Sequence, residues 1–337
     1  GLLAEGEING GHLVAVCDID AEKAKRTGEK HGVPYFTDMH EMMESCKNDI
    51  DVVSILTESG NHARHCLALA PYGKHILVEK PMALTLDDAD AMIEACDKAG
   101  LKLFVVKQNR YNLPVTKLRK ALDEERFGKL VMWTVRVRWS RNQAYYDQAP
   151  WRGTWAEDGG VFANQASHHV DLLEWMLGEP DTVFAYSRTA LVNIEAEDTG
   201  VAVIKFRNGA IGVIEATTAT RPKDLEGSVS ILGENGTVEI GGFAVNEMKI
   251  WNFVDEREED KDIIAQFSEN PPNVYGFGHK SYLENIVSSL ANETHSLVDG
   301  LEGRKSLKLI SAIYESIETG KEVKMRFEAK KCRLGRN

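Results

Sequence analysis

Short apolar runs alternate with helical patterns over the first third of the chain, and no other feature constrains the fold as strongly. Each run has the length of one strand, and the four runs lie at 12–17, 51–56, 76–78 and 103–106. Amphipathic stretches separate them, at about 21–31, 61–72 and 85–100. Strands that alternate with helices predict a doubly wound parallel sheet with right-handed crossovers.

The pattern changes after about residue 128. Residues 131–139 alternate apolar and polar side chains, which predicts a strand with one apolar face. Further strands are expected near 182–190, 199–207, 210–219, 227–232, 236–240 and 247–254. Asn208-Gly209 and Asn235-Gly236 are typical hairpin turns, so we expect this second sheet to be largely antiparallel. Two helices, at about 279–292 and 301–319, follow it.

Length and charge narrow the class of protein. A chain of 337 residues is too long for one typical hydrophobic core, so we expect two domains, over 1–112 and 113–337. The net charge of −12 argues against nucleic acid or an anionic membrane as the main partner. No apolar stretch approaches the roughly 20 residues that span a bilayer.

The cysteines and histidines do not form a recognisable metal motif. Five cysteines are scattered without a CxxC pair, which favours reduced thiols in a cytoplasmic protein. A zinc site would have to combine His168 and His169 with His62, His65 and Cys66. Adjacent helical residues point about 100° apart, and no carboxylate or thiol sits at a usual ligand spacing. We therefore expect no metal.

Glu79-Lys80-Pro81 comes directly after the apolar run 76–78. In open α/β sheets, ligands bind at the carboxyl ends of the strands. Burial and a nearby cation both lower the pKa of a lysine, and such a lysine can exchange protons with a substrate hydroxyl. The alternative is a surface lysine that happens to follow a strand, and the motifs described below favour the functional interpretation.

Asp18 follows the first apolar run. An acidic residue at such a strand end binds the adenosine ribose hydroxyls of a dinucleotide and repels a 2′-phosphate, which favours NAD over NADP. The alternative is a helix N-cap, for which Asp20 is better placed. No GxGxxG loop occurs in the sequence. Its usual spacing of about 20 residues places it near or before residue 1, so we expect the first strand and phosphate loop to be missing from this chain.

A second dense segment covers 158–173. Ser167 is a plausible N-cap, which places His168 in the first turn of a helix. Asp171 is then one turn away on the same face and is expected to accept a hydrogen bond from the imidazole. A helix N-terminus disfavours imidazolium, so a neutral His168 is expected to face a substrate. The alternative is a capping or surface role.

The polar stretch 107–112 follows the fourth apolar run. It supplies a guanidinium, amides and a phenol, which suit sugar hydroxyls or a carboxylate. The alternative is simple turn polarity before Pro114.

In their order and spacing, these motifs resemble the Gfo/Idh/MocA family of nicotinamide-dependent sugar and polyol oxidoreductases. The residues that carry the resemblance are Asp18, 57–62, Glu79-Lys80-Pro81, 108–111, Gly159-Gly160, His168, Asp171 and 299–306. The match spans nearly the whole chain. It implies NAD as cofactor and a Rossmann-type domain followed by an α+β domain with a large, mostly antiparallel sheet. It also implies a homotetramer packed through that sheet.

The resemblance also assigns residues to roles. Lys80 is the expected acid/base, with His168 as its catalytic partner. The expected cofactor-binding residues are Asp18, Thr57, Asn61, His62, Glu79, Lys80 and Gln108. The expected substrate-binding residues are Lys80, Arg110, Tyr111, Asn164, Gln165 and His168.

One departure from the family pattern concerns the catalytic centre. The family usually has Asp-x-Gly-x-His where this chain has Asn164 to His168. Losing that carboxylate leaves more of the proton transfer to Lys80.

The segments 107–112, 164–169 and 275–279 resemble one branch of the family in particular. That branch oxidises C3 of UDP-N-acetylglucosaminuronic acid (UDP-GlcNAcA) in surface polysaccharide, including lipopolysaccharide, biosynthesis. The alternatives are an inositol or simple-sugar dehydrogenase of the same family and a non-catalytic nucleotide-binding regulatory protein.

Overall fold

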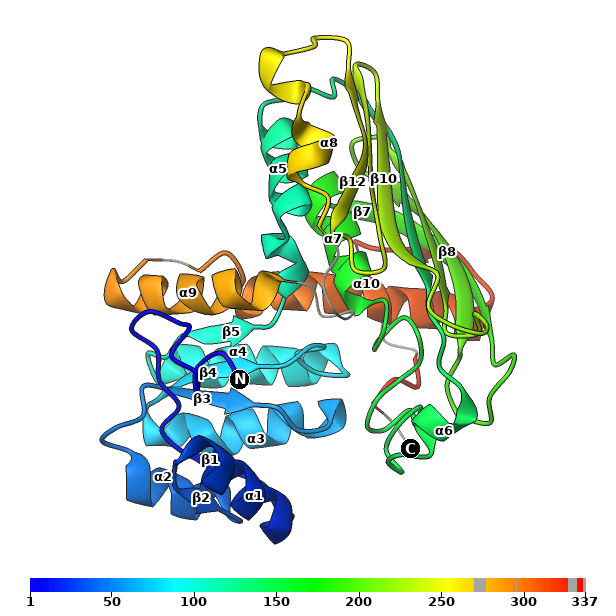
Figure 1. Ribbon diagram of the computed structural model, residues 1–337. Coiled ribbons are helices and arrows are strands. Elements are labelled where there is room, and N and C mark those ends of the chain that lie inside the picture. Colours follow the sequence, from blue (N-terminus) through cyan, green and yellow to red (C-terminus); the bar gives the residue numbers. More distant parts are fainter. Residues whose placement is uncertain (270–276, 295, 327–331, 336–337) are drawn as a thin grey trace.

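The computed structural model describes residues 1–269, 277–294, 296–326 and 332–335. Tyr275 and Gly276 of the branch motif therefore lie outside the described residues. Figure 1 shows a layered α/β part formed by the N-terminal third and a tall sheet formed by the middle of the chain. The expected two-part architecture, a Rossmann-type parallel sheet followed by a mostly antiparallel one, is confirmed.

The strands of the first part are parallel, as predicted. They form one pair, β1 (Val16–Cys17) with β2 (Tyr35–Phe36), and one triplet, β3 (Val52–Ile55), β4 (His75–Val78) and β5 (Leu103–Val105). The predicted first strand is shorter than expected. Its regular pairing covers two residues, because β2, the strand that pairs with it among the described residues, is itself two residues long.

Helices cover both faces of the triplet. Their bounds, with the short 3-10 turns, are α1 (Ala21–His31), α2 (Met39–Cys46), η1 (Ser59–Asn61), α3 (His62–Leu69), η2 (Ala70–Tyr72) and α4 (Leu86–Lys98). Ile76 and Val78 pack into the core with α3 and α4, whereas Leu77 points to the other face. β4 is therefore buried on both faces, which explains its unbroken apolar run. Asp20 caps α1 as predicted; β2 and α2 had no clear sequence signal.

The second sheet has the order β12-β11-β10-β6-β9-β8-β7-β13. Its strands are β6 (Leu130–Arg138), β7 (Pro180–Arg188), β8 (Thr199–Phe206), β9 (Ile211–Thr217), β10 (Glu226–Gly233), β11 (Gly236–Gly241), β12 (Glu247–Phe253) and β13 (Val323–Lys324). β6 and β9 run parallel, and the other described pairs are antiparallel. The two predicted hairpins are confirmed, at Asn208-Gly209 between β8 and β9 and at Asn235-Gly236 between β10 and β11.

A long helix near the end of the chain connects the parts. The remaining helices are η3 (Gln108–Tyr111), α5 (Leu113–Asp123), α6 (Gln143–Tyr146), α7 (Ser167–Leu177), η4 (Glu258–Asp260), α8 (Ile263–Gln266), α9 (Gly278–Ala291) and α10 (Gly300–Thr319). α10 begins against β5, where a Cβ on Gly303 would lie 2.6 Å from Val105 Cγ2, and continues along β7 (Figure 1).

α9 packs on the first sheet through Tyr282 and Ile286, although the predicted boundary assigns it to the second domain. That boundary, after residue 112, stays a prediction. No described helix is long and apolar enough to cross a membrane.

Candidate active site

Lys80 lies just beyond the end of β4 and reaches across to the second part of the chain. Its Nζ donates to the backbone oxygen of Asn164 at 3.0 Å and to Oδ1 of the same residue at 3.1 Å. Burial lowers the pKa of Lys80; the negative charges of Glu79 and Asp158 oppose this effect and Arg152 adds to it, so the pKa lies below its ordinary value. The site thus holds a lysine prone to lose its proton.

Asn164 connects Lys80 to a buried acid. The amide nitrogen of Asn164 donates to Oδ1 of Asp158, whose other oxygen accepts from the backbone N–H of Gly153 at 2.7 Å. Burial raises the pKa of Asp158 above its ordinary value despite these partners. Asp158 follows a stretch of aromatic and polar residues without periodicity, and only its place before Gly159-Gly160 pointed to a role.

A buried hydrogen-bond cluster fixes the loop that carries Asn164. Glu197 accepts from the backbone N–H of Phe162 at 3.0 Å and from the Tyr314 hydroxyl at 2.9 Å. The same hydroxyl accepts from Gly160 N–H at 3.1 Å. A Cβ at Gly160 would lie 2.0 Å from Glu197 Oε2, so this approach requires glycine. Burial raises the pKa of Glu197 to about 7.

His168 lies in the first turn of α7, as predicted, and faces Gln108. Its Nε2 is 3.1 Å from the Gln108 amide nitrogen, which donates, so the ring proton sits on Nδ1. Within the described part of the chain, His168 Nδ1 and Gln108 Oε1 are buried without a partner. Burial, and then the charges of Lys80 and Lys107, lower the pKa of His168 well below its ordinary value. The imidazole is therefore neutral.

Two predictions about α7 were wrong. The helix begins at Ser167 rather than after it, and the Ser167 hydroxyl donates to Asn164 O at 2.9 Å instead of capping the helix. Asp171 binds Arg110 and not His168, with Oδ2 at 2.8 Å from Nε and Oδ1 at 2.9 Å from Nη2. A two-pronged charged contact is stronger than a bond to a neutral imidazole.

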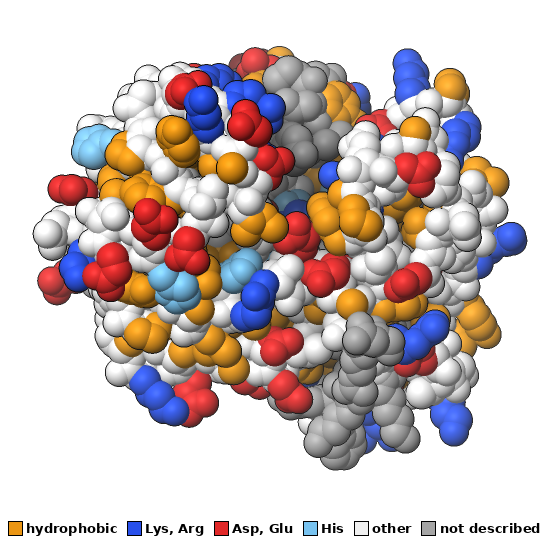
Figure 2. All heavy atoms as spheres, turned by 90° about the horizontal axis from the view of Figure 1, so that it is seen from below, with side chains coloured by type: hydrophobic (Ala, Val, Ile, Leu, Met, Phe, Trp, Pro, Cys, Tyr) orange, Lys and Arg blue, Asp and Glu red, His pale blue; other side chains and the backbone are white. Residues whose placement is uncertain are grey.

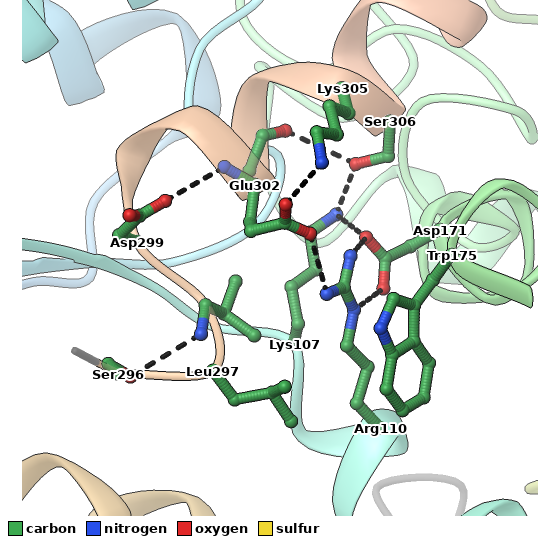
Figure 3. Close-up of polar contacts among 12 residues, drawn as sticks. Lys107, Arg110, Asp171, Trp175, Ser296, Leu297, Asp299, Glu302, Lys305 and Ser306 are labelled. Atoms are coloured by element: carbon green, nitrogen blue, oxygen red, sulfur yellow. Dashed lines mark hydrogen bonds and ion pairs between the residues drawn. The ribbon is translucent and has the colours of Figure 1, made fainter. Parts of the chain in front are cut away.

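Arg110 is the centre of a buried ionic network rather than a free substrate ligand (Figure 3). Its side chain is fully buried, and Nη1 donates to Glu302 at 3.0 Å. Lys107 also pairs with Asp171, with 3.6 Å between Nζ and Oδ1. Figure 3 shows the guanidinium enclosed by Asp171, Glu302 and Trp175. In this structure Arg110 therefore joins α7 to α10, and its expected contact with substrate stays a prediction.

Tyr111 and Gln165 differ in how far they can reach a ligand. The Tyr111 hydroxyl donates to Asn285 Oδ1 on α9 at 2.9 Å, and burial raises its pKa to about 12. Gln165 is 6% exposed and lies between Asn164 and α7. Their expected part in substrate binding stays a prediction.

The expected cofactor residues line the carboxyl ends of the parallel strands. Asp18 follows β1 and forms an ion pair with Lys23. Thr57 follows β3, and its hydroxyl lies 3.0 Å from His65 Nδ1. Glu79 follows β4, where Oε2 accepts from the backbone N–H of Lys80 at 3.0 Å. Together with the unpartnered Gln108 Oε1, this edge fits a dinucleotide, as the dinucleotide-binding rule predicts.

His62 bridges the residues that follow β3 and β4. Its Nδ1 is 2.9 Å from Pro81 O and its Nε2 is 3.0 Å from Thr57 O. Both ring nitrogens are engaged by backbone, and the side chain is buried. His62 therefore joins the β3 and β4 ends, and its expected contact with the cofactor stays a prediction.

The turn at η1 docks on the loop before Asp158. Asn61 donates to Glu157 Oε2 at 3.1 Å, and Gly60 N–H donates to Glu157 O at 3.1 Å. A Cβ at Gly60 would lie 2.3 Å from Ala156 O, so the approach again requires glycine. The cofactor edge and the loop that positions Lys80 are therefore in direct contact.

Arg152 is a half-buried cation that the sequence pattern did not reveal. Its guanidinium lies over the rings of Tyr145 and Trp151, at 4.3 and 4.7 Å from their centres, and Nη1 donates to the Tyr145 hydroxyl at 2.5 Å. Its Nε is buried without a partner among the described residues. Its charge reaches Lys80 and Asp158. The only hint in the sequence is an arginine enclosed by aromatic residues.

The surface view agrees with a ligand site between the two parts. Figure 2 shows the surface hollowed between two lobes, with acidic side chains at the rim. No group of three histidine, cysteine or acidic side chains within the described ranges is arranged to hold a metal ion.

Two sequence profiles match the chain. Residues 4–107 match the NAD-binding Rossmann fold of an oxidoreductase family, and residues 119–325 match its C-terminal alpha/beta domain. Among curated proteins, myo-inositol 2-dehydrogenase of Thermotoga maritima is 27% identical over 323 residues, covering 93% of this chain and 91% of the relative.

Two solved structures resemble this one more strongly. The WlbA dehydrogenase from Bordetella pertussis, in complex with NADH and UDP-GlcNAcA, has a TM-score of 0.91 and 42% identity, covering 96% of this chain and 92% of its own. The WlbA dehydrogenase from Chromobacterium violaceum, with the same two ligands, has a TM-score of 0.88 and 42% identity, covering 96% and 90%.

Proposed function

The chain belongs to the Gfo/Idh/MocA family of oxidoreductases and is an NAD-dependent dehydrogenase of sugar substrates; from this premise we propose that it oxidises C3 of UDP-GlcNAcA. The observation that carries the proposal is the 42% identity, over nearly the whole chain, to dehydrogenases that hold NADH and UDP-GlcNAcA. The choice of C3 follows from the resemblance of residues 107–112 and 164–169 to that branch.

Lys80 is the proposed base. It accepts the proton of the 3-hydroxyl as the C3 hydrogen leaves with its electron pair and the C3–O bond becomes a carbonyl. Its burial supports this role, because a lysine whose pKa lies below its ordinary value is more often neutral near pH 7.

His168 and the strand-end residues are the proposed positioning groups. His168 carries its ring proton on the unpartnered Nδ1 and would donate to a sugar hydroxyl, which orients the C–H bond for transfer. Asp18, Thr57, Asn61, Glu79 and Gln108 would hold NAD along the strand ends. The chemistry that bound NAD supplies is acceptance of the hydride.

Arg152 is the proposed contact for an acidic group of the substrate. Arg110 already pairs with Asp171 and Glu302, whereas Arg152 contacts the Tyr145 hydroxyl and has a buried Nε without a partner among the described residues. In a chain with a net charge of −12, a locally positive site is needed to hold a sugar acid. Tyr145 and Trp151 hold the guanidinium in place by stacking.

The assembly and the setting belong to the same proposal. A homotetramer packed through the second sheet is supported by the exposed apolar side chains of Tyr186, Val201 and Val203 on its outer face. A cytoplasmic location and a role in surface polysaccharide biosynthesis follow from the expected reduced thiols and from the branch resemblance.

Inositol oxidation is the second candidate, because myo-inositol 2-dehydrogenase of Thermotoga maritima matches 93% of the chain. Purified protein should be incubated with NAD and UDP-GlcNAcA, UDP-N-acetylglucosamine or myo-inositol, and NADH followed by its absorbance. We expect NADH with UDP-GlcNAcA alone. Turnover of myo-inositol without turnover of UDP-GlcNAcA would favour the second candidate.

A further inference from the structure

A continuous chain of polar contacts joins Asp158 to Lys80. Both contacts of the Lys80 Nζ go to Asn164, to its backbone oxygen at 3.0 Å and to its Oδ1 at 3.1 Å. The amide nitrogen of the same residue donates to Asp158. The acid, 2% exposed, is held in turn by Gly153 N–H at 2.7 Å.

The two contacts to Asn164 leave one corner of the Lys80 nitrogen for the lone pair of the neutral amine. A neutral lysine nitrogen has two N–H donors and one lone pair, whereas the ammonium form has three donors. Asn164 supplies two acceptors, one for each N–H of the neutral form. The lone pair then occupies the remaining corner of the nitrogen, which is the position a base needs to accept a proton.

The ionised carboxylate of Asp158 sets the sense of the Asn164 amide. A carboxylate can only accept, so it faces the amide nitrogen and leaves the amide oxygen toward the N–H of Lys80. An aspartate at 164 would instead place two carboxylates in contact, which raises the pKa of one of them. Asparagine is therefore the residue that fits between Asp158 and a lysine base.

We propose that Asp158 is a positioning residue for the reaction, acting through Asn164 to hold the Lys80 amine with its lone pair toward the substrate hydroxyl. This inference rests on the proposed role of Lys80 as base. The carboxylate missing from position 164 is supplied by Asp158, six residues earlier. In the step itself, the substrate O–H bond breaks and an N–H bond forms on Lys80, while the C3 hydride passes to NAD.

Other charged and titratable groups also face this chain. Those that act on Lys80 or are affected by it are Glu79, Arg152, Lys107, His62 and His168. Those that act on Asp158 or are affected by it are Arg152, Tyr146 and Glu197. None of them lies between Asp158 and Lys80 in this series of hydrogen bonds. Substitutions at 158 and 164 therefore test the connection through Asn164 specifically.

The test compares pH profiles of kcat. Asp158→Asn removes a negative charge near Lys80, which lowers the Lys80 pKa, so the acid limb should move down by about one pH unit. Its plateau should fall about tenfold, because the amide loses its fixed orientation. The exchange Asn164→Asp with Asp158→Asn brings a carboxylate against Lys80 and should move the limb to higher pH. Asp181→Asn, which makes the same change of charge at an exposed residue of β7, is the matched control and should leave the limb in place.

A second readout does not depend on the substrate. The side-chain NMR signal of Lys80, assigned through Lys80→Met, is titrated in the NAD complex of each variant. The Lys80 signal should titrate at lower pH in Asp158→Asn than in the wild type, and at higher pH in the exchange variant. These shifts remain measurable even if UDP-GlcNAcA is not the substrate. An unmoved Lys80 titration in both Asp158→Asn and the exchange variant would overturn the inference, as would an equal shift in Asp181→Asn.

Discussion

At the scale of single residues, function depends on how the surroundings change ordinary side chains. Lys80 follows a strand that is buried on both faces and is itself partly buried, which lowers its pKa. Its lowered pKa means that the neutral form appears at lower pH than for a free lysine. As a base, Lys80 must be neutral, so kcat should rise with pH and level off below the range where an exposed lysine titrates.

Replacing Lys80 by methionine tests the base directly. The variant keeps the bulk of the side chain but removes the amine, and kcat should fall by about 10²–10⁴-fold. NAD affinity, measured by calorimetry, should change little. Equal loss of turnover and of NAD binding would contradict the assignment.

Replacing Arg152 tests the contact with the acidic group. Arg152→Gln should raise KM for UDP-GlcNAcA by about tenfold or more, because a charged hydrogen bond contributes about 1.5–3 kcal/mol. Arg152→Lys should recover only part of this loss, since lysine lacks the planar fork that stacks between the two rings. Steady-state kinetics with UDP-N-acetylglucosamine, which lacks the carboxylate, provide the comparison. An unchanged KM in Arg152→Gln would rule the contact out.

The sequence located Lys80 because a strand end is a local feature. It did not locate Asp158 or Arg152, because their roles arise from contacts with Asn164, Tyr145 and Trp151 that no periodic pattern encodes. The ion pairs of Arg110 were not predicted for the related reason that its partners, Asp171 and Glu302, come from distant helices.

At the scale of elements, one ionic network joins η3, α7 and α10. Asp171 on α7 pairs with Arg110 of η3 and with Lys107, which precedes η3. Arg110 pairs in addition with Glu302 on α10 (Figure 3). Burial alone would raise the pKa of Asp171, but the charges of Arg110 and Lys107 outweigh it, and the pKa lies below its ordinary value. The network therefore fixes the helix that carries His168.

Removing the Asp171 charge should destabilise the protein. Breaking one partner of a buried ion pair costs about 3–5 kcal/mol, so Asp171→Asn should lower the free energy of unfolding, measured in denaturant at pH 7, by about that amount. The folded pKa is depressed, so the contribution is present above the unfolded pKa of about 3.9 and is lost as pH falls through the folded value.

The control for this change is Asp123→Asn on α5. Asp123 pairs with Arg119 at the surface, where such pairs contribute at most about 1 kcal/mol. Equal effects of the two substitutions, or no fading of the difference between Asp171→Asn and wild type at low pH, would contradict the network's role.

At the scale of the whole molecule, the periodic patterns predicted most of the architecture. Both sheets, the two hairpins and the closing helices were expected from the alternation of apolar runs. The packing of α9 on the first sheet was not, because its apolar face has the same pattern whichever domain it covers.

The outer face of the second sheet carries a prediction about assembly. Tyr186 is 71% exposed, and Val201 and Val203 are each 44% exposed, on neighbouring strands. Changing Val201 and Val203 together to aspartate should reduce the particle mass measured by light scattering, because burying unpaired charges in an apolar interface is unfavourable. Ile19→Asp, at a site 93% exposed in the first part, should leave the mass unchanged. An unchanged mass in the double variant would place the interface elsewhere.

The central claim is that this chain passes a hydride from C3 of UDP-GlcNAcA to NAD with Lys80 as base. Its most direct test is the product formed by the wild-type protein and by Lys80→Met from UDP-GlcNAcA and NAD, identified by NMR and matched to the NADH formed. The wild type should form a 3-keto sugar nucleotide in equal amount to NADH, and Lys80→Met should form both about 10²–10⁴-fold more slowly. Oxidation at another carbon, or turnover at the wild-type rate in Lys80→Met, would contradict the claim.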